Sequence, residues 1–206
     1  MLTFVAVVVL ALFLFFGCTG ETSSSVISAR APGQNSHFSL PQSAVSYVAT
    51  YTVVDGDSQL TKKVFRANDK IRIDVSAPNA NSFSLFFLGS SAYSCYNAGG
   101  TITCYDISSV LSQTQIDALL PAPDLSGAKE AESVDIGQTT GKCYFVPQDI
   151  ARKRKMCLTS DGILAYDSYN DTQTTTHVEY LTSLTYSVDD SNFLLPSSPQ
   201  AIPQIT

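Results

Sequence analysis

The five cysteines are the residues whose type and spacing most directly predict chemistry. Cys95 and Cys104 lie symmetrically about Gly99-Gly100 in the stretch SCYNAGGTITC. Glycine adopts positive φ at little steric cost, so this pair suits both central positions of a two-residue type I′ hairpin turn. Such a turn pairs residues whose numbers sum to 199, which places the two cysteines opposite each other with about 4.5 Å between their Cα atoms. We therefore predict a disulfide across a β-hairpin.

Cys18 ends an apolar run that begins at Leu2 and contains no charged side chain. Such a run is typical of an export signal or a membrane anchor. At ~1.5 Å per residue it reaches only ~22 Å of the ~30 Å hydrocarbon core. The glycine directly before Cys18 is similar to the lipobox of secreted lipoproteins, in which the cysteine carries the lipid. We interpret residues 1–18 as a lipoprotein signal and anchor, with an uncleaved single span or simple secretion as the alternatives.

The four other cysteines are enough for two disulfides once Cys18 is set aside as the lipid carrier. Four cysteines allow three pairings; the turn register favours the local one and leaves Cys143 for Cys157 by elimination. A zinc site is the competing interpretation, but there is no C-x-x-C motif, and His37 and His177 are far apart in sequence. We therefore expect no metal, and we expect the chain after Cys18 to lie outside the cytoplasm, in an oxidising compartment.

Other patterns do not predict catalysis or a cofactor. There is no G-x-S-x-G elbow, glycine-rich phosphate loop or EF-hand loop. His177, Glu130, Glu132 and Asp135 fall at positions that we interpret as solvent-facing strand residues. Eighteen acidic against twelve basic side chains argue against nucleic-acid binding. We expect a protein that is not an enzyme.

The run RKRK at residues 152–155 concentrates four of the twelve basic side chains in one loop. It suits contact with anionic lipid headgroups. A solvated hairpin tip, kept charged against aggregation, is the alternative that we favour.

Asn170 begins the sequon Asn170-Asp171-Thr172. On an exported domain this sequon is a candidate glycosylation site.

The elements that must position these residues are mainly strands. Twenty-one Tyr and Phe residues and no Trp give a β-favouring composition. Short alternating runs, separated by turn pairs such as Asp55-Gly56, predict strands within residues 46–77, 81–107 and 128–188. Between residues 108 and 120 apolar residues recur close to helical spacing, and Pro121 follows. This predicts one helix, or two short ones, that cover an apolar face of the sheet.

Large apolar residues recur at alternating strand positions and suit either the lining of an apolar ligand groove or an ordinary core. The groove candidates are Tyr47, Tyr51, Ile73, Phe83, Phe87, Tyr93, Tyr166 and Tyr180.

The arrangement as a whole resembles the LolA/LppX-like lipoprotein carriers. The shared features are a lipobox-like cysteine, an antiparallel meander, a helix after the sixth strand, further strands, and an ending of acidic turn, aromatic residue and proline in residues 190–196 (DSNFLLP). The resemblance covers about residues 45–196. It implies a mainly β (α+β) fold, a curved antiparallel half-barrel sheet with one or two short helices packed on the concave face. It also implies a lipid or acylated molecule bound between sheet and helix.

These features divide the chain into an anchor (1–18), a flexible tether (19–40), a half-barrel domain (41–196) and a disordered tail (197–206). We expect a lipoprotein anchored to the outer face of the cell membrane that binds a lipid or another hydrophobic ligand in the groove. The alternative is a non-enzymatic cell-surface module, structural or binding a surface protein partner, whose core is filled by its own helix.

Overall fold

A computed structural model describes residues 40, 45–78, 80–119, 125, 127–136, 139–146, 154–171 and 175–202. All of them belong to one compact unit, residues 35–206. The predicted anchor with Cys18, and the predicted tether up to residue 39, lie outside the described residues. No helix in the described part of the chain combines the length and the apolar character needed to cross a membrane.

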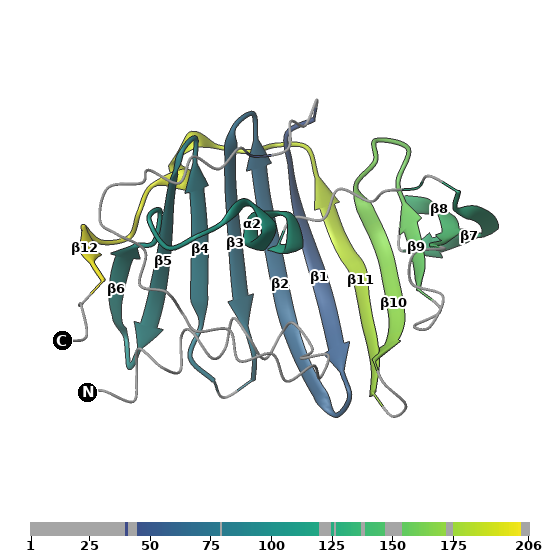
Figure 1. Cartoon of the computed structure of the whole chain (residues 1–206), viewed down its shortest axis with the longest axis horizontal. Helices are drawn as coiled ribbons and strands as arrows, with labels where there is room; N and C mark the ends of the chain where they lie inside the picture. The colour runs from purple at the N-terminus through teal and green to yellow at the C-terminus, as the bar shows by residue number, and fades with distance from the viewer. Residues whose placement is uncertain are drawn as a thin grey trace. The chain divides into compact units, whose positions relative to one another are not determined.

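One curved sheet of twelve strands forms the described domain (Figure 1). The strand order is β12-β6-β5-β4-β3-β2-β1-β11-β10-β9-β8-β7, and every neighbouring pair is antiparallel except β12 and β6. The predicted half-barrel fold class is confirmed. The strands are β1 Tyr47–Asp55, β2 Ser58–Ala67, β3 Lys70–Ser76, β4 Phe83–Leu88, β5 Ser91–Ala98, β6 Thr101–Asp106, β7 Lys129–Ile136, β8 Thr139–Phe145, β9 Lys155–Leu158, β10 Leu164–Asp171, β11 Thr175–Thr185 and β12 Pro199–Ala201.

The hairpin of β5 and β6 has the predicted register. Gly99 and Gly100 have φ of 58° and 87°, as the type I′ turn requires. Cys95 pairs with Cys104 across the two strands, and their disulfide joins Cα atoms 4.0 Å apart. The second predicted disulfide, Cys143–Cys157, is confirmed between β8 and β9.

A short helix, α2 (Gln113–Leu119), lies across one face of the sheet (Figure 1). Ser112 and Gln115 form a reciprocal capping box, because the Gln115 carboxamide accepts from the Ser112 backbone at 2.9 Å and the Ser112 hydroxyl accepts from the Gln115 backbone at 3.4 Å. Ile116 is fully buried against the sheet, together with Ile107 and Leu111. The predicted helix is confirmed but is shorter than residues 108–120.

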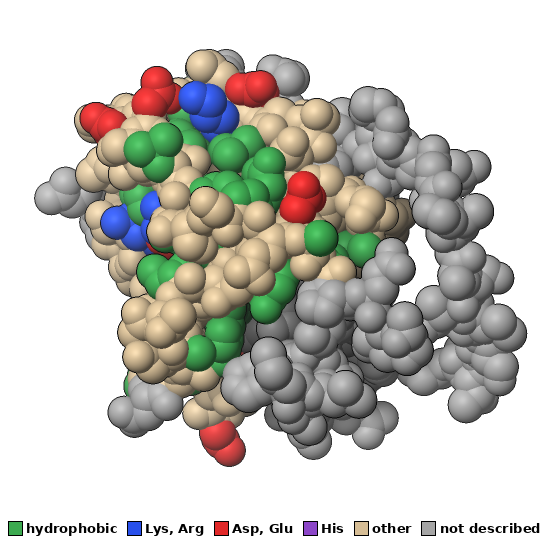
Figure 2. Space-filling model, turned by 90° about the vertical axis from the view of Figure 1, so that its left-hand side faces the viewer, with side chains coloured by type: hydrophobic (Ala, Val, Ile, Leu, Met, Phe, Trp, Pro, Cys, Tyr) green, Lys and Arg blue, Asp and Glu red, His purple; other side chains and the backbone are tan. Residues whose placement is uncertain are grey.

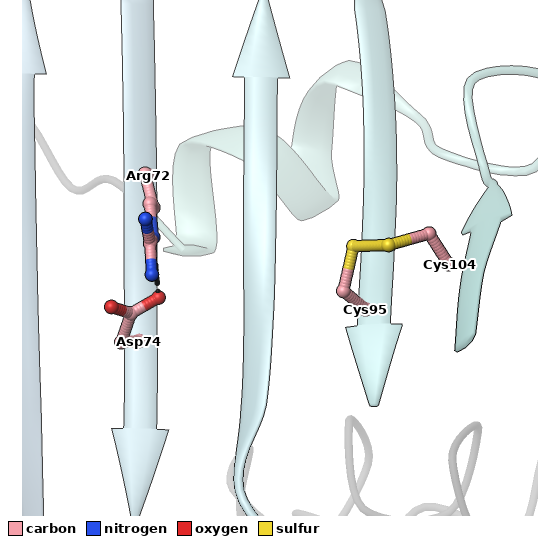
Figure 3. Close-up of a disulfide and its surroundings, with 4 residues drawn as sticks. All are labelled: Arg72, Asp74, Cys95 and Cys104. Atoms are coloured by element: carbon pink, nitrogen blue, oxygen red, sulfur yellow. Dashed lines mark hydrogen bonds and ion pairs between the residues drawn. A yellow bond between two sulfur atoms is a disulfide. The ribbon is translucent and has the colours of Figure 1, made fainter. Parts of the chain in front are cut away.

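The opposite face of β3 to β6 is closed by the C-terminal segment rather than by a helix of the predicted region. The 3-10 helix η2 (Asp190–Phe193) buries Phe193, and the Arg72 guanidinium donates to the backbone oxygen of Asn192 at 3.0 Å. That guanidinium lies 5.0 Å from the ring centroids of both Phe65 and Phe86. Figure 3 shows Arg72 and the Cys95–Cys104 disulfide on this face, with α2 behind the sheet.

A further strand follows η2, within the segment for which the sequence predicts a tail. Residues 199–201 form β12, which pairs in parallel with residues 104–106 of β6. The prediction of a disordered tail over residues 197–206 is therefore wrong for residues 199–201, which form β12. The three residues of β12 are too few to show the hydrophobic alternation by which a strand is predicted from sequence.

Gly141 in β8 occupies a position where a side chain would collide with the core. A Cβ atom there would lie 3.1 Å from the Cβ atoms of both Ala165 and Cys157. Gly141→Ala is expected to lower the free energy of unfolding by about 1–3 kcal/mol, because this packed region must shift to admit a methyl group. Urea unfolding measures the change, with the exposed Ser133→Ala on β7 as the control. Equal stability of the two variants would show that the packing around Gly141 has room for a methyl group and would contradict the prediction.

Candidate functional site

The face of the sheet beneath α2 is the candidate ligand-binding face. Five of the eight predicted groove residues lie in or against the one buried cluster that includes Ile116 of α2. Tyr51, Ile73 and Phe87 are buried within it, and Tyr47 and Phe83 pack against it half-buried. Cross-strand partners share a face of a sheet, and the register pairs Val64 of β2 with both Ala49 and Ile73. One continuous apolar face therefore runs across β1 to β5.

The other three groove candidates lie elsewhere, which corrects the predicted set. Tyr93 pairs with Phe86 and packs beside the Cys95–Cys104 disulfide on the opposite face. Tyr180 pairs with Thr52 and with Tyr166, so both tyrosines lie on the face opposite Tyr51. The predicted alternation along one strand is correct. The face predicted for these three tyrosines is wrong, because it depends on the turns and on a register shift in the pairing of β1 with β11, where Thr50 pairs with Ser183 but Tyr51 pairs with Leu181.

Beyond Tyr51 this same face becomes ionic. The Lys62 ammonium lies 2.7 Å from a buried Glu179 carboxylate oxygen. Arg154 donates two hydrogen bonds, of 2.9 and 2.7 Å, to the buried carboxylate of Asp167. Asp167 and Glu179 face each other on β10 and β11, so the two ion pairs form one cluster.

Sequence reasoning missed this ionic cluster. The alternation of the strands contained a signal for it. Residues two apart in a strand lie on the same face, and Lys62 is two residues before the buried Val64, as Glu179 is two before the buried Leu181. A charged residue on the same face as buried residues of its strand is itself turned toward the core and needs an oppositely charged partner there.

Two tyrosines stand at the border of the apolar and ionic parts. Burial raises the pKa of Tyr51 well above its usual value, and neighbouring Tyr47 and Glu179 raise it further. Burial also raises the pKa of Tyr47, although its hydrogen bond with Arg66 opposes that shift. Both phenols therefore stay neutral at physiological pH.

Three of the four residues that we interpret as solvent-facing strand positions have structural partners, and the fourth, Glu132, is exposed on β7. His177 stacks on Tyr169, with ring centroids 4.6 Å apart. Glu130 pairs with Lys142 at 3.2 Å, and Asp135 accepts a hydrogen bond from Thr140 at 2.8 Å. The described ranges contain no group of three or more His, Cys, Asp or Glu side chains that could hold a metal ion.

Two of the predicted surface features, the sequon and the RKRK run, lie partly outside the described residues. Asn170 lies on β10 opposite Thr176, but Thr172 of its sequon is outside the described residues, so glycosylation stays a prediction. Of the RKRK run, Arg152 and Lys153 are also outside them, whereas Arg154 is bound to Asp167.

The domain is thus a curved half-barrel sheet whose face beneath α2 is apolar on one side and ionic on the other. No family model and no curated protein matches the sequence. Solved structures do match by fold. MucB is 13% identical over 76% of this chain, with a TM-score of 0.52, and MucB in complex with MucA(peri) is 10% identical over 77%, with a TM-score of 0.51. The match spans 59% of the MucB chain and 57% of the matched chain in the complex, so this chain corresponds to about three fifths of that protein.

Two further solved structures are similar at lower TM-scores. LprF from Mycobacterium bovis is 11% identical over 75% of this chain and 91% of its own, with a TM-score of 0.41. A LolA superfamily protein from Nitrosomonas europaea is 6% identical over 78% of this chain and 94% of its own, with a TM-score of 0.31. The predicted LolA-like resemblance is confirmed as one of fold, which the sheet itself and the likeness to MucB carry.

Proposed function

We propose that this domain is a non-enzymatic binding module that holds a lipid or another hydrophobic ligand between its apolar sheet face and the segment that contains α2. The observation that carries the proposal is the difference in extent between the apolar sheet face and the few side chains that cover it. The buried cluster extends over β1 to β5, whereas its buried members outside the strands, among the residues that the structure describes, are Leu40, Ile107, Leu111 and Ile116. A ligand chain that replaces these side chains would keep the face out of water, which is the main energetic requirement of such a surface.

The two covers of the sheet are attached differently. On the opposite face, η2 is held by the Lys70–Asp190 ion pair at 2.9 Å and by the Arg72 hydrogen bond. The α2 segment is tied to the sheet at its start, where Ile107 and Ser108 hydrogen-bond the backbone of Ala92. Within α2, the side chain of Ile116 is fully buried in the cluster. We propose that the α2 segment is the cover that moves to admit a ligand.

The setting of the module follows from its cysteines. Two disulfides suit a protein outside the cytoplasm, where thiols are oxidised. We further propose that a lipid on Cys18 anchors the chain to the outer face of the membrane, with residues 19–39 as the tether. Leu40, the last residue of the predicted tether, is buried in the core cluster and belongs to the domain.

A second candidate function is the binding of a protein partner by a module with a self-filled core. Tyr51, Ile73 and Phe87 are buried by the domain's own side chains, as that function requires. The end of the domain at β6 and β12 carries hydrophobic side chains among mostly uncharged ones (Figure 2), and Ile102 of β6 and Leu194 are exposed. MucB, which has this fold, is known in complex with MucA(peri).

Native mass spectrometry of the full chain, purified gently from membranes, separates the two functions. The proposed function predicts an extra mass that organic extraction removes, and a Cys18 lipid predicts a covalent mass that survives denaturation. In addition, Ile116→Ala is expected to speed the exchange of bound palmitate by about 30-fold, because it removes ~2 kcal/mol of helix attachment. Val110→Ala, which is exposed in the same segment, is the matched control.

The partner-binding function predicts a different result. The chain then carries no extractable mass, palmitate does not bind, and Ile116→Ala changes only the stability of the domain. That result would overturn the ligand-binding proposal.

A further inference from the structure

An exposed phenylalanine lies between two lysines at the β7 edge of the sheet. The register pairs Lys129 of β7 with Phe145 of β8, and Phe145 with Lys155 of β9. Directly opposite residues on neighbouring strands share a face, with Cβ atoms about 4.5–5.5 Å apart. The three side chains therefore form one row, which we call the edge row.

Phe145 differs from the other described phenylalanines in its exposure to solvent. Six of the eleven phenylalanines lie in the described residues, and Phe145 alone among them is exposed, at 51%. Burial of a phenyl group is favourable, and this position forgoes about half of that gain. A lone exposed aromatic residue is common on protein surfaces, so the meaning of this one depends on its neighbours.

Those neighbours carry positive charge that no ion pair between described residues compensates. Among the described residues, the ion pairs use Lys62, Lys70 and Lys142, and none uses Lys129 or Lys155. The adjacent charges are directed to the other face by strand alternation, where Glu130 binds Lys142 and Arg154 binds Asp167. The edge row is thus a local positive site on a chain whose net charge is −6.

We propose that the edge row is a docking surface for a membrane that contains anionic phospholipid. An aromatic ring enters the boundary between headgroups and acyl chains, and the lysine stems extend along it while their ammonium groups reach lipid phosphates. Each lysine near an anionic surface contributes about 1 kcal/mol. This docking does not rest on the proposed ligand, since the edge row and the apolar face under α2 involve different residues.

The absence of tryptophan from the chain allows a local test. Phe145→Trp introduces a single fluorophore into the full chain, which is then reconstituted into vesicles of phosphatidylcholine with or without 30% phosphatidylglycerol. The expected result is a blue-shifted emission that brominated lipid quenches, in the anionic vesicles only. Because the signal reports position 145 itself, attachment of the N-terminal segment to either vesicle does not affect it.

Two controls make the result specific. Tyr186→Trp, another exposed aromatic position, is expected to show neither shift nor quenching. Adding Lys129→Gln and Lys155→Gln to Phe145→Trp is expected to weaken docking by roughly 30-fold, about fivefold for each lysine. An unshifted emission in anionic vesicles would overturn the proposal, as would equal quenching in neutral vesicles or no effect of the lysine changes.

Discussion

Arg154→Met is expected to lower the free energy of unfolding by about 3 kcal/mol or more, whereas Asp167→Asn is expected to lower it by about 1–2 kcal/mol. The difference comes from burial. The Asp167 side chain is 7% exposed, so removing the guanidinium leaves a carboxylate without its two charged hydrogen bonds in a place that water barely reaches. The Arg154 side chain is 25% exposed and can turn toward water when its partner becomes neutral.

Urea unfolding at neutral pH, with both disulfides intact, measures this asymmetry. Methionine keeps the apolar stem of the arginine, so the loss reports the guanidinium rather than the packing of the chain. Lys142→Met is the control, because its ion pair with Glu130 is solvent-exposed on both sides and contributes little. If Asp167→Asn proved as costly as Arg154→Met, the buried carboxylate would not be the origin of the effect.

The parts of the fold that local geometry dictates were predictable from the sequence. The Gly99-Gly100 turn determines the hairpin register by itself, and that register led to the first disulfide and, by elimination, to the second. Helical spacing and a following proline likewise revealed α2. These features depend on residues close together in the chain.

The parts that could not be predicted depend on pairing between distant strands. Tyr166 and Tyr180 alternate as a lining residue should, but which face they occupy depends on the pairing of β11 with β1 across more than a hundred residues of sequence. The cover of the Phe86 face is also distant, because Arg72 in β3 holds the backbone of Asn192. The ionic cluster unites β2, β10, β11 and Arg154 just before β9. No short-range pattern contains such pairings.

Removing either disulfide is expected to cost about 3 kcal/mol, and removing both is expected to leave no stable domain at 37 °C. The bridges close loops with sequence separations of 9 and 14, for which the chain-entropy model gives about 2.7 and 3 kcal/mol. One lies between β5 and β6 beside Phe86, and the other between β8 and β9 beside Ala165. Because they share no neighbours, the two losses should add, to about 6 kcal/mol, which is comparable with the whole stability of many domains.

Thermal unfolding of Cys95→Ala/Cys104→Ala, of Cys143→Ala/Cys157→Ala and of the fourfold variant tests this additivity. The intact domain should also show no alkylation of these four residues without reductant, because every one of them is buried and paired. A fourfold variant that unfolds at the temperature of either double variant would mean that the two ends of the sheet are coupled. The α2 segment, which lies across the middle strands of the sheet (Figure 1), is the element that we expect to transmit such coupling.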